Sequence, residues 1–150
     1  MIRKARIADA PLIHALIKVW AKKGKVLDRP LNYIYENIRD YWVDEHGKRI
    51  VACCALHVIG WEGLAEIKSL IVSQTHQNRG IGASLVVQCL AEAKGLGAGS
   101  IFALTFAGPF FKKLGFRTID RKELPHKIWN DCVNCVNFPD CREEAVLYKL

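Results

Sequence analysis

The feature that most constrains this chain is a glycine-containing loop between a strand-like run and a helical pattern. Upstream, residues 65–72 are rich in β-branched side chains and have the length of a strand. Downstream, apolar residues recur at helical spacing, at Ile81, Leu85, Val86, Cys89, Leu90 and Ala93. The loop that joins them reads Gln77-Asn78-Arg79-Gly80-Ile81-Gly82-Ala83-Ser84. It therefore lies where a strand passes into the N-terminus of a helix.

Such a junction can bind an anion. The first N–H groups of a helix lack intrahelical partners and the helix dipole favours negative charge there. Glycine lets the backbone approach a phosphate closely, and Arg79 adds a permanently charged donor. Neither a P-loop nor a dinucleotide fingerprint fits, because no lysine follows Gly82 and Leu85 stands where a third glycine is needed. An ordinary glycine turn before a helix is the alternative interpretation.

The remaining pattern, Q-x-x-G-x-G-A, resembles the pyrophosphate-binding signature of the GNAT family of N-acetyltransferases, which bind acetyl-CoA. The resemblance covers nearly the whole chain. A first strand at residues 2–6 is followed by a helix with Asp9 at its start, and residues 100–105 form a later strand. Residues 111–116 then match the family's aromatic-x-x-x-Gly-Phe pattern.

This resemblance implies an α/β fold with a mixed, mostly antiparallel sheet of six to seven strands and helices on both faces. It also implies acetyl-CoA as cosubstrate. The family presents strand backbone to the pantetheine arm, which assigns that role here to Leu70, Ile71 and Val72. Together with the loop from Gln77 to Ser84, and with Phe111, these residues form the expected cofactor site.

Size and charge narrow the class of protein. The 150 residues suit one domain, 1–150, with a cysteine-containing segment, 124–144, inside it. No apolar run approaches the roughly 20 residues of a membrane span, and the N-terminus lacks the apolar core of a signal peptide, so we expect a cytoplasmic protein without a membrane partner. The net charge of +7, from 22 basic and 15 acidic residues, is compatible with nucleic-acid binding. The basic residues are scattered, however, and we expect no nucleic-acid partner.

The coarse order of elements is β α α β β β α β α β, which predicts a mixed sheet covered by helices. Cys53 and Cys54 lie in one apolar strand, so alternation places them on opposite faces as small buried hydrophobes. Near the C-terminus, Cys132, Cys135 and Cys141 have the spacing C-x-x-C-x5-C. With His126 they could hold a structural zinc, but we favour reduced thiols and assign no metal to the chemistry.

Acetyl transfer to an amine requires a base, and Glu66 is the main candidate because it precedes the cofactor loop on the same strand. Lys68, two residues on, faces the same side of the sheet and would hold Glu66 ionised or bind an anionic substrate. An exposed surface pair is the alternative. His57 and His14 are weaker candidates. Many family members use a tyrosine to protonate the departing thiolate, but Phe111 stands at that position and has no proton to give.

A narrower resemblance concerns the acceptor. Residues 27–31, 66–70 and 124–132 resemble the short, single-domain N-acetylglutamate synthases of bacterial arginine biosynthesis, which implies acetyl transfer to L-glutamate. A substrate with two carboxylates needs fixed cations. The leading candidates are Arg29 and Lys68, followed by Lys127, Arg117 and Arg121.

Three rival functions stay open. One is acetylation of another small-molecule or protein amine, and another is a non-catalytic acetyl-CoA-binding module. The third is nucleic-acid binding through the basic surface. A homodimer also stays open.

Overall fold

The computed structural model describes residues 1–60, 63–124 and 143–150. Its strands form one seven-stranded sheet in the order β1-β2-β3-β4-β5-β7-β6. All neighbouring strands are antiparallel except β4 and β5. The strands are β1 Ile2–Lys4, β2 Tyr41–His46, β3 Arg49–Val58, β4 Leu64–Val72, β5 Ser100–Thr105, β6 Arg117–Ile119 and β7 Glu144–Lys149. The expected mixed, mostly antiparallel sheet is confirmed, with β6 as a strand that the sequence did not predict.

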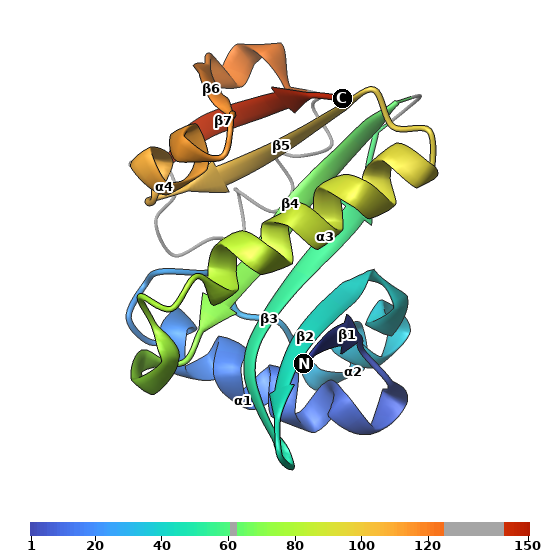
Figure 1. Cartoon of the computed structure of the whole chain (residues 1–150), viewed down its shortest axis with the longest axis vertical. Coiled ribbons are helices and arrows are strands. Elements are labelled where there is room, and N and C mark those ends of the chain that lie inside the picture. Colours follow the sequence, from blue (N-terminus) through green and yellow to red (C-terminus); the bar gives the residue numbers. More distant parts are fainter. Residues whose placement is uncertain (61–62, 125–142) are drawn as a thin grey trace.

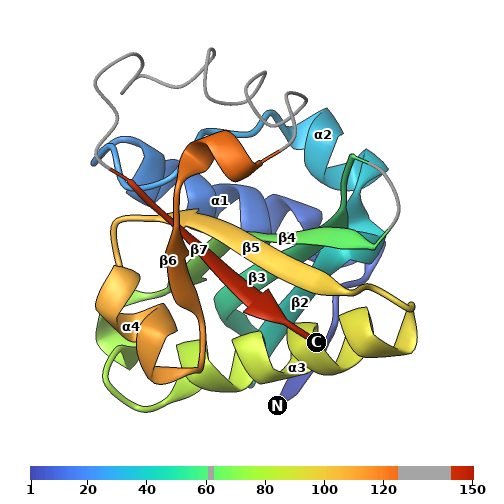
Figure 2. The same cartoon turned by 90° about the horizontal axis from the view of Figure 1, so that it is seen from above.

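Helices cover both faces of the sheet, as expected. They are α1 Ala10–Ala21, α2 Leu31–Glu36, α3 Ile81–Gly95 and α4 Gly108–Lys113. In Figures 1 and 2, α1 and α2 lie on one face, and α3 and α4 lie on the other. Short 3-10 turns, η1 Ile7–Asp9, η2 Ile38–Asp40, η3 Gln74–His76 and η4 Arg121–Glu123, join several elements. No helix in the described ranges has the length and apolar content needed to cross a bilayer.

Asp9 directly precedes α1 and makes no side-chain capping bond to that helix, but its carboxylate holds the preceding turn η1. Its carboxylate accepts a hydrogen bond from the backbone N–H of Arg6 at 2.7 Å and two from the Arg3 guanidinium, at 2.7 and 3.0 Å. The hydrogen bonds from Arg3 hold the pKa of Asp9 below its ordinary value. Ile13 and Ile17 then bury one face of the helix, whereas Leu12 is 44% exposed.

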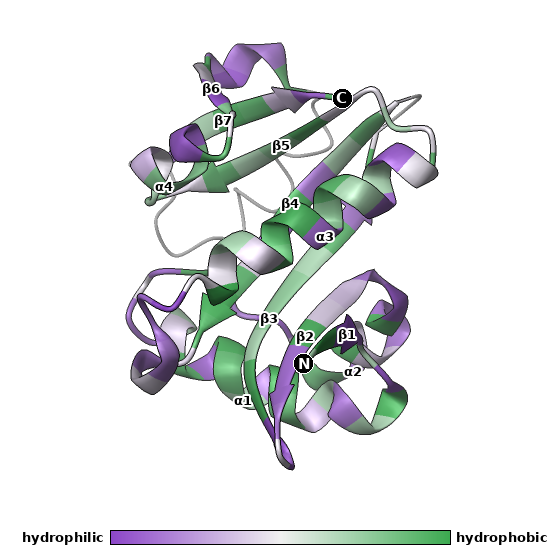
Figure 3. Ribbon diagram, in the orientation of Figure 1, coloured by the Kyte–Doolittle hydropathy of each residue, from purple (hydrophilic) through white to green (hydrophobic). Residues whose placement is uncertain are grey.

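The sheet divides the core into two layers, which the residues of β3 illustrate. Cys54 packs toward α3, where its Sγ lies 3.6 Å from that of Cys89, and Cys53 packs toward α1 and α2. The predicted opposite placement of Cys53 and Cys54 is therefore confirmed. Both thiols are fully buried, and burial raises the pKa of Cys53 to about 12. Figure 3 shows the hydrophobic residues concentrated along β3, β4 and β5, between the helical layers.

The sheet splits between its two parallel strands. Residues 64–66 of β4 pair with residues 100–102 of β5, and no pairing continues beyond Glu66 and Phe102 in the described part of these strands. In the same region β4 carries a bulge against β3, since Cys53 pairs with Ile71 but Ala55 pairs with Lys68. The divergence of β4 and β5 opens the sheet from one face to the other.

Candidate active site

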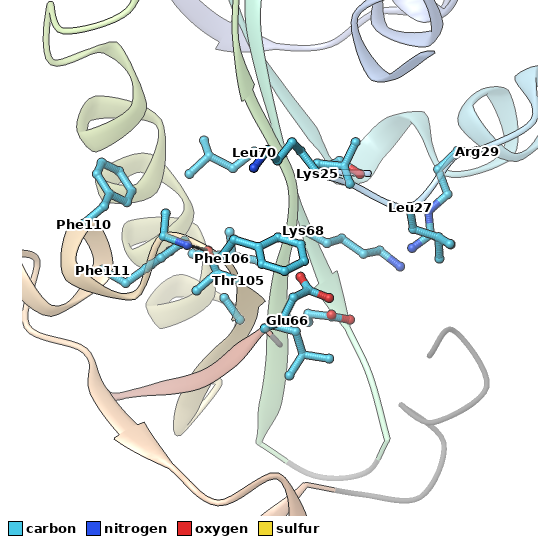
Figure 4. A pocket seen from close by; sticks show the side chains of 17 residues that line it. Lys25, Leu27, Arg29, Glu66, Lys68, Leu70, Thr105, Phe106, Phe110 and Phe111 are labelled. Atoms are coloured by element: carbon cyan, nitrogen blue, oxygen red, sulfur yellow. Dashed lines mark hydrogen bonds between the residues drawn. The ribbon is translucent and has the colours of Figure 1, made fainter. Parts of the chain in front are cut away.

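A cleft occupies the opening between β4 and β5. Its walls come from β4, from the end of β5, from the loop between α1 and α2, and from α4 (Figure 4). A second hollow continues the cleft along β4 toward Gln77, and the two share Lys25, Leu70 and Phe106. The cleft therefore runs from Glu66 at one end to the glycine loop at the other.

The β4 edge of the cleft offers unpaired backbone groups. Ser73 donates its N–H to Val51 of β3 at 2.8 Å, so alternation along the strand directs the N–H groups of Val72 and Leu70 away from β3. The Val72 carbonyl accepts the Gln77 side-chain amide at 3.2 Å. Ser69, in the bulge, has the left-handed φ of 54°, which is uncommon for a residue with a side chain. Ile71, by contrast, pairs with Cys53 and buries its side chain.

The glycine loop ends at the N-terminus of α3, as the sequence predicts. Gly80 has φ +79° and Asn78 has φ +63°, so the chain makes two left-handed steps before the helix. The first bond within the helix turn runs from the Ser84 N–H to the Gly80 carbonyl at 3.0 Å. The N–H groups of residues 81–83 thus lack intrahelical partners and are available to an anion. The exposed Arg79 side chain adds a positive charge beside them.

Gly82 lies where α3 approaches β4 and α4. A Cβ on Gly82 would lie 3.4 Å from the Phe110 ring and 3.7 Å from the Val72 side chain. The N–H groups at the start of α3 suit a pyrophosphate, and the absence of a side chain at Gly82 leaves room beside them. The open edge of β4 suits an extended chain attached to that pyrophosphate. The chain's own residues thus suit CoA at this end of the cleft.

Glu66 lies at the opposite end. The residue is only 6% exposed, and its side chain and that of Lys68 point into the same part of the cleft (Figure 4). The predicted shared orientation of Glu66 and Lys68 is confirmed. A buried carboxylate that lines a cleft differs from an exposed surface pair, because burial strengthens its interactions with charged neighbours.

Two cations meet on one tyrosine beside Glu66. The Lys68 ammonium donates to the Tyr33 hydroxyl at 2.8 Å, and the Arg29 guanidinium lies 4.8 Å from the centre of the same ring. Arg29 is 8% exposed and lines the cleft together with Lys68. Sequence reasoning identifies both cations but misses Tyr33, because a tyrosine in a short amphipathic helix carries no signal of its own.

The far wall of the cleft is aromatic. Phe111 is 3% exposed and makes edge-to-face contacts with Phe110 and Phe116, with ring centres 5.1 Å apart in each pair. Thr105 lines both hollows, and its Oγ1 accepts the Ala107 N–H at 2.8 Å. Since that bond uses an oxygen lone pair, the Thr105 hydroxyl keeps its proton for a second partner. Thr105 is a further site residue that sequence reasoning misses.

The remaining predicted residues either lie outside the described residues or do not line the cleft. Lys127, His126 and the three cysteines of the C-terminal segment lie outside the described residues. Arg117 is exposed on β6, and Arg121 donates to the Glu143 carbonyl at 2.6 Å, with neither arginine among the described residues that line the cleft. Glu143 itself does line it, so the cleft holds a second carboxylate besides Glu66.

Comparison with known proteins places this geometry in a family. The acetyltransferase (GNAT) family profile matches residues 12–116. An uncharacterized N-acetyltransferase of Chlorobaculum tepidum is 37% identical over 149 residues, which cover 99% of this chain and 96% of that protein. The amino-acid acetyltransferase of Mycobacterium tuberculosis is 33% identical over 135 residues, which cover 87% of this chain and 76% of that enzyme.

A solved structure extends the likeness to the fold. N-acetylglutamate synthase from Neisseria gonorrhoeae, crystallised with coenzyme A and N-acetyl-glutamate, superposes with a TM-score of 0.90 at 29% identity. The match covers all of this chain but 35% of that one, so the chain corresponds to about a third of the gonococcal enzyme. The glycine loop, the divergence of β4 from β5 and the cleft agree with these matches. The chain therefore belongs to the acetyltransferase (GNAT) family and is an N-acetyltransferase that takes its acetyl group from acetyl-CoA.

Proposed function

We propose that this enzyme acetylates the α-amino group of L-glutamate and so makes N-acetylglutamate, the first step of arginine biosynthesis. The observation that carries the proposal is the cluster of Arg29, Lys68 and Tyr33 beside the buried Glu66. Two cations held on one aromatic ring suit a small dicarboxylate, because fixed cations recognise carboxylates. The names of relatives, amino-acid acetyltransferase and N-acetylglutamate synthase, support the same substrate class.

In this proposal the cosubstrate lies along β4 with its pyrophosphate at α3. Leu70 and Val72 offer backbone groups to the pantetheine arm, and Ile71 between them fixes the strand by its buried side chain. The loop holds the pyrophosphate through backbone N–H groups and the charge of Arg79. Phe110 and Phe111 provide an apolar wall. Bound acetyl-CoA supplies the thioester whose carbonyl carbon is attacked.

Glu66 acts as the general base in this proposal. The amino group of free glutamate is protonated at neutral pH, and it must lose a proton before it can attack. Glu66 takes that proton, and the cations Lys68 and Arg29 line the same cleft. They bind the carboxylates of the same substrate, which brings the amine against Glu66.

The chain also offers groups for the other two charges that develop. An N–H group on the open edge of β4 that the pantetheine arm leaves unused can donate to the carbonyl oxygen as negative charge builds there. Phe111 cannot protonate the departing sulfur, so we propose that the Thr105 hydroxyl, whose oxygen is oriented by the Ala107 N–H, donates a hydrogen bond to the thiolate, which then takes its proton from water. Lys127, outside the described residues, is a further proposed contact for the substrate.

A second candidate acceptor is an amine with more than one positive charge. Glu143 adds a carboxylate to the cleft, and two carboxylates suit an acceptor with more than one ammonium group, such as lysine or a polyamine. The buried Arg29 opposes that alternative, because a cationic acceptor would meet like charge next to Tyr33.

An acceptor panel with a free-thiol readout tests the proposal. The purified enzyme is incubated with acetyl-CoA and, separately, L-glutamate, L-aspartate, L-lysine or spermidine. We expect fast CoA release with L-glutamate and little with the others. Equal release with all four acceptors, or faster release with lysine or spermidine, would contradict glutamate as the substrate.

A further inference from the structure

His57 lies directly behind Glu66, on the side away from the cleft. The two residues are register partners in the antiparallel pair β3–β4, so their side chains lie on the same face of the sheet. Directly opposed Cβ atoms in such a pair are about 5 Å apart. Glu66 on β4 lines the cleft, His57 is not among the described residues that line it, and β3, which carries His57, lies on the side of β4 away from β5.

His57 is held by a carboxylate. Its Nδ1 lies 2.7 Å from Oδ2 of Asp40, which ends the 3-10 turn before β2. An ionised carboxylate can only accept, so Nδ1 carries the proton of this bond and Nε2 is the acceptor nitrogen of the neutral ring. An imidazolium formed when Nε2 takes a proton keeps the same Nδ1 hydrogen bond to Asp40.

Exposure falls from this pair toward the cleft. The side chains of His57 and Asp40 are 30% and 25% exposed, whereas Glu66 is 6% exposed. A base that is nearly buried needs a route by which its proton reaches solvent before the next turnover. Asp40 precedes β2, Lys68 lies two residues from Glu66 on β4, and Arg29 and Glu143 line the cleft with Glu66. Of these residues, His57 has two ring nitrogens, so that Nε2 can take a proton while Nδ1 keeps its hydrogen bond to Asp40.

We infer that His57, held by Asp40, relays the proton from Glu66 to solvent; this rests on the proposed role of Glu66 as base. The amine's proton first passes to the Glu66 carboxylate. The carboxylic acid then gives it to Nε2 of His57, directly or through one water molecule, and the imidazolium releases it to bulk water. Glu66 returns to its ionised form with no net change in the protein. His57 is thus a positioning residue that acts through Glu66.

The first test is His57→Gln, assayed with the best acceptor of the panel. We expect kcat to fall about tenfold and the solvent deuterium isotope effect on kcat to increase, with the KM values for acetyl-CoA and acceptor within about twofold of wild type. Asp40→Asn keeps the imidazole but removes its charged partner, and it should lower kcat in the same direction. His57→Ala should regain activity when imidazole is added to the buffer, which a purely structural role would not produce.

The matched control is His46, which forms the other histidine–carboxylate pair of the described residues, with Asp44 at 3.0 Å. It lies at the far end of β2 and does not line the cleft, so His46→Gln should keep the wild-type kcat. Glu66→Gln is assayed in parallel. If Glu66→Gln is inactive and His57→Gln and Asp40→Asn keep full kcat, the relay alone is wrong. Lost activity of His57→Ala that imidazole does not restore would also overturn it, and full activity of Glu66→Gln would overturn the base and the relay together.

Discussion

In the proposed function, the two ends of the cleft recognise their ligands in different ways. At the α3 end, recognition rests on backbone: the open edge of β4, the left-handed Gly80 and the first N–H groups of the helix. At the Glu66 end it rests on side chains from separate elements, with Arg29 and Tyr33 converging on β4. Backbone groups bind any ligand with the same arm and pyrophosphate, whereas side chains can differ from one relative to the next. We therefore expect cosubstrate binding and acceptor choice to respond to separate sets of mutations.

The largest effect should come from Glu66→Gln. Losing a general base lowers kcat by about 10²- to 10⁴-fold, and the acidic limb of the pH–rate profile should disappear with it. The KM for acetyl-CoA should stay unchanged, because the backbone end of the cleft is intact. Steady-state kinetics across pH would measure both. An unaltered profile would show that another group takes the proton.

The two ends of the cleft also differ in how far their residues could be predicted from the sequence. The loop is recognisable because its glycines and flanking periodicities are contiguous, so a local pattern carries the whole site. Glu66 and Lys68 are recognisable because they share that strand. Tyr33, Thr105 and the pairing of His57 with Asp40 depend on how distant segments meet, and nothing in the chain near each of them indicates it.

The fold follows the same division. The long elements have clear apolar periodicity, so the order of strands and helices and the opposite facing of Cys53 and Cys54 could be predicted. The three-residue strand β6 is too short to show alternation and could not be predicted. The bulge at Ser69 could not be predicted from the sequence either, because a serine does not indicate a left-handed backbone as glycine does.

A second prediction separates the acceptor end from the cosubstrate end. Arg29→Ala should raise the glutamate KM by roughly 10- to 100-fold, the worth of a charged hydrogen bond, and leave the acetyl-CoA KM within about twofold. Arg29→Lys keeps the charge without the planar fork and should fall between. Arg39→Ala, at an exposed arginine outside the cleft lining, is the control. Unchanged glutamate kinetics in Arg29→Ala would remove Arg29 from the site.

Gly80→Ala should weaken the binding of acetyl-CoA and leave the binding of glutamate nearly unchanged, which is the opposite of the effect expected from Arg29→Ala. Gly80 has φ +79° with open space where a methyl group would lie, so alanine introduces backbone strain of about 1–2 kcal/mol without a clash. The loop should shift to relieve it, and the acetyl-CoA KM should rise about tenfold with the glutamate KM little changed. Gly97→Ala is the matched control, because Gly97 has φ +87° and equally open surroundings at the other end of α3. Similar losses of thermal stability but equal acetyl-CoA KM values in both variants would argue against a pyrophosphate site at Gly80.

The smallest effect is expected from Tyr33→Phe. The ring that Arg29 contacts remains, and the hydroxyl that accepts from Lys68 at 2.8 Å is lost. We expect a rise of about fivefold in the glutamate KM, the worth of about 1 kcal/mol, with kcat nearly constant. Tyr33→Leu removes both contacts and should have the larger effect. If both variants match wild type in glutamate titrations, the tyrosine does not organise the two cations.

The most direct test of the central claim compares L-glutamate with L-glutamine as acceptors. Glutamine has a neutral amide where glutamate has its side-chain carboxylate. The ratio of their kcat/KM values therefore measures whether the cations of the acceptor end select a negatively charged side chain. We predict a preference for glutamate of at least about tenfold in the wild type, which Arg29→Ala or Lys68→Met should shrink. Equal kcat/KM values, or a preference for glutamine that Arg29→Ala leaves unchanged, would contradict an acceptor site built on Arg29, Lys68 and Tyr33.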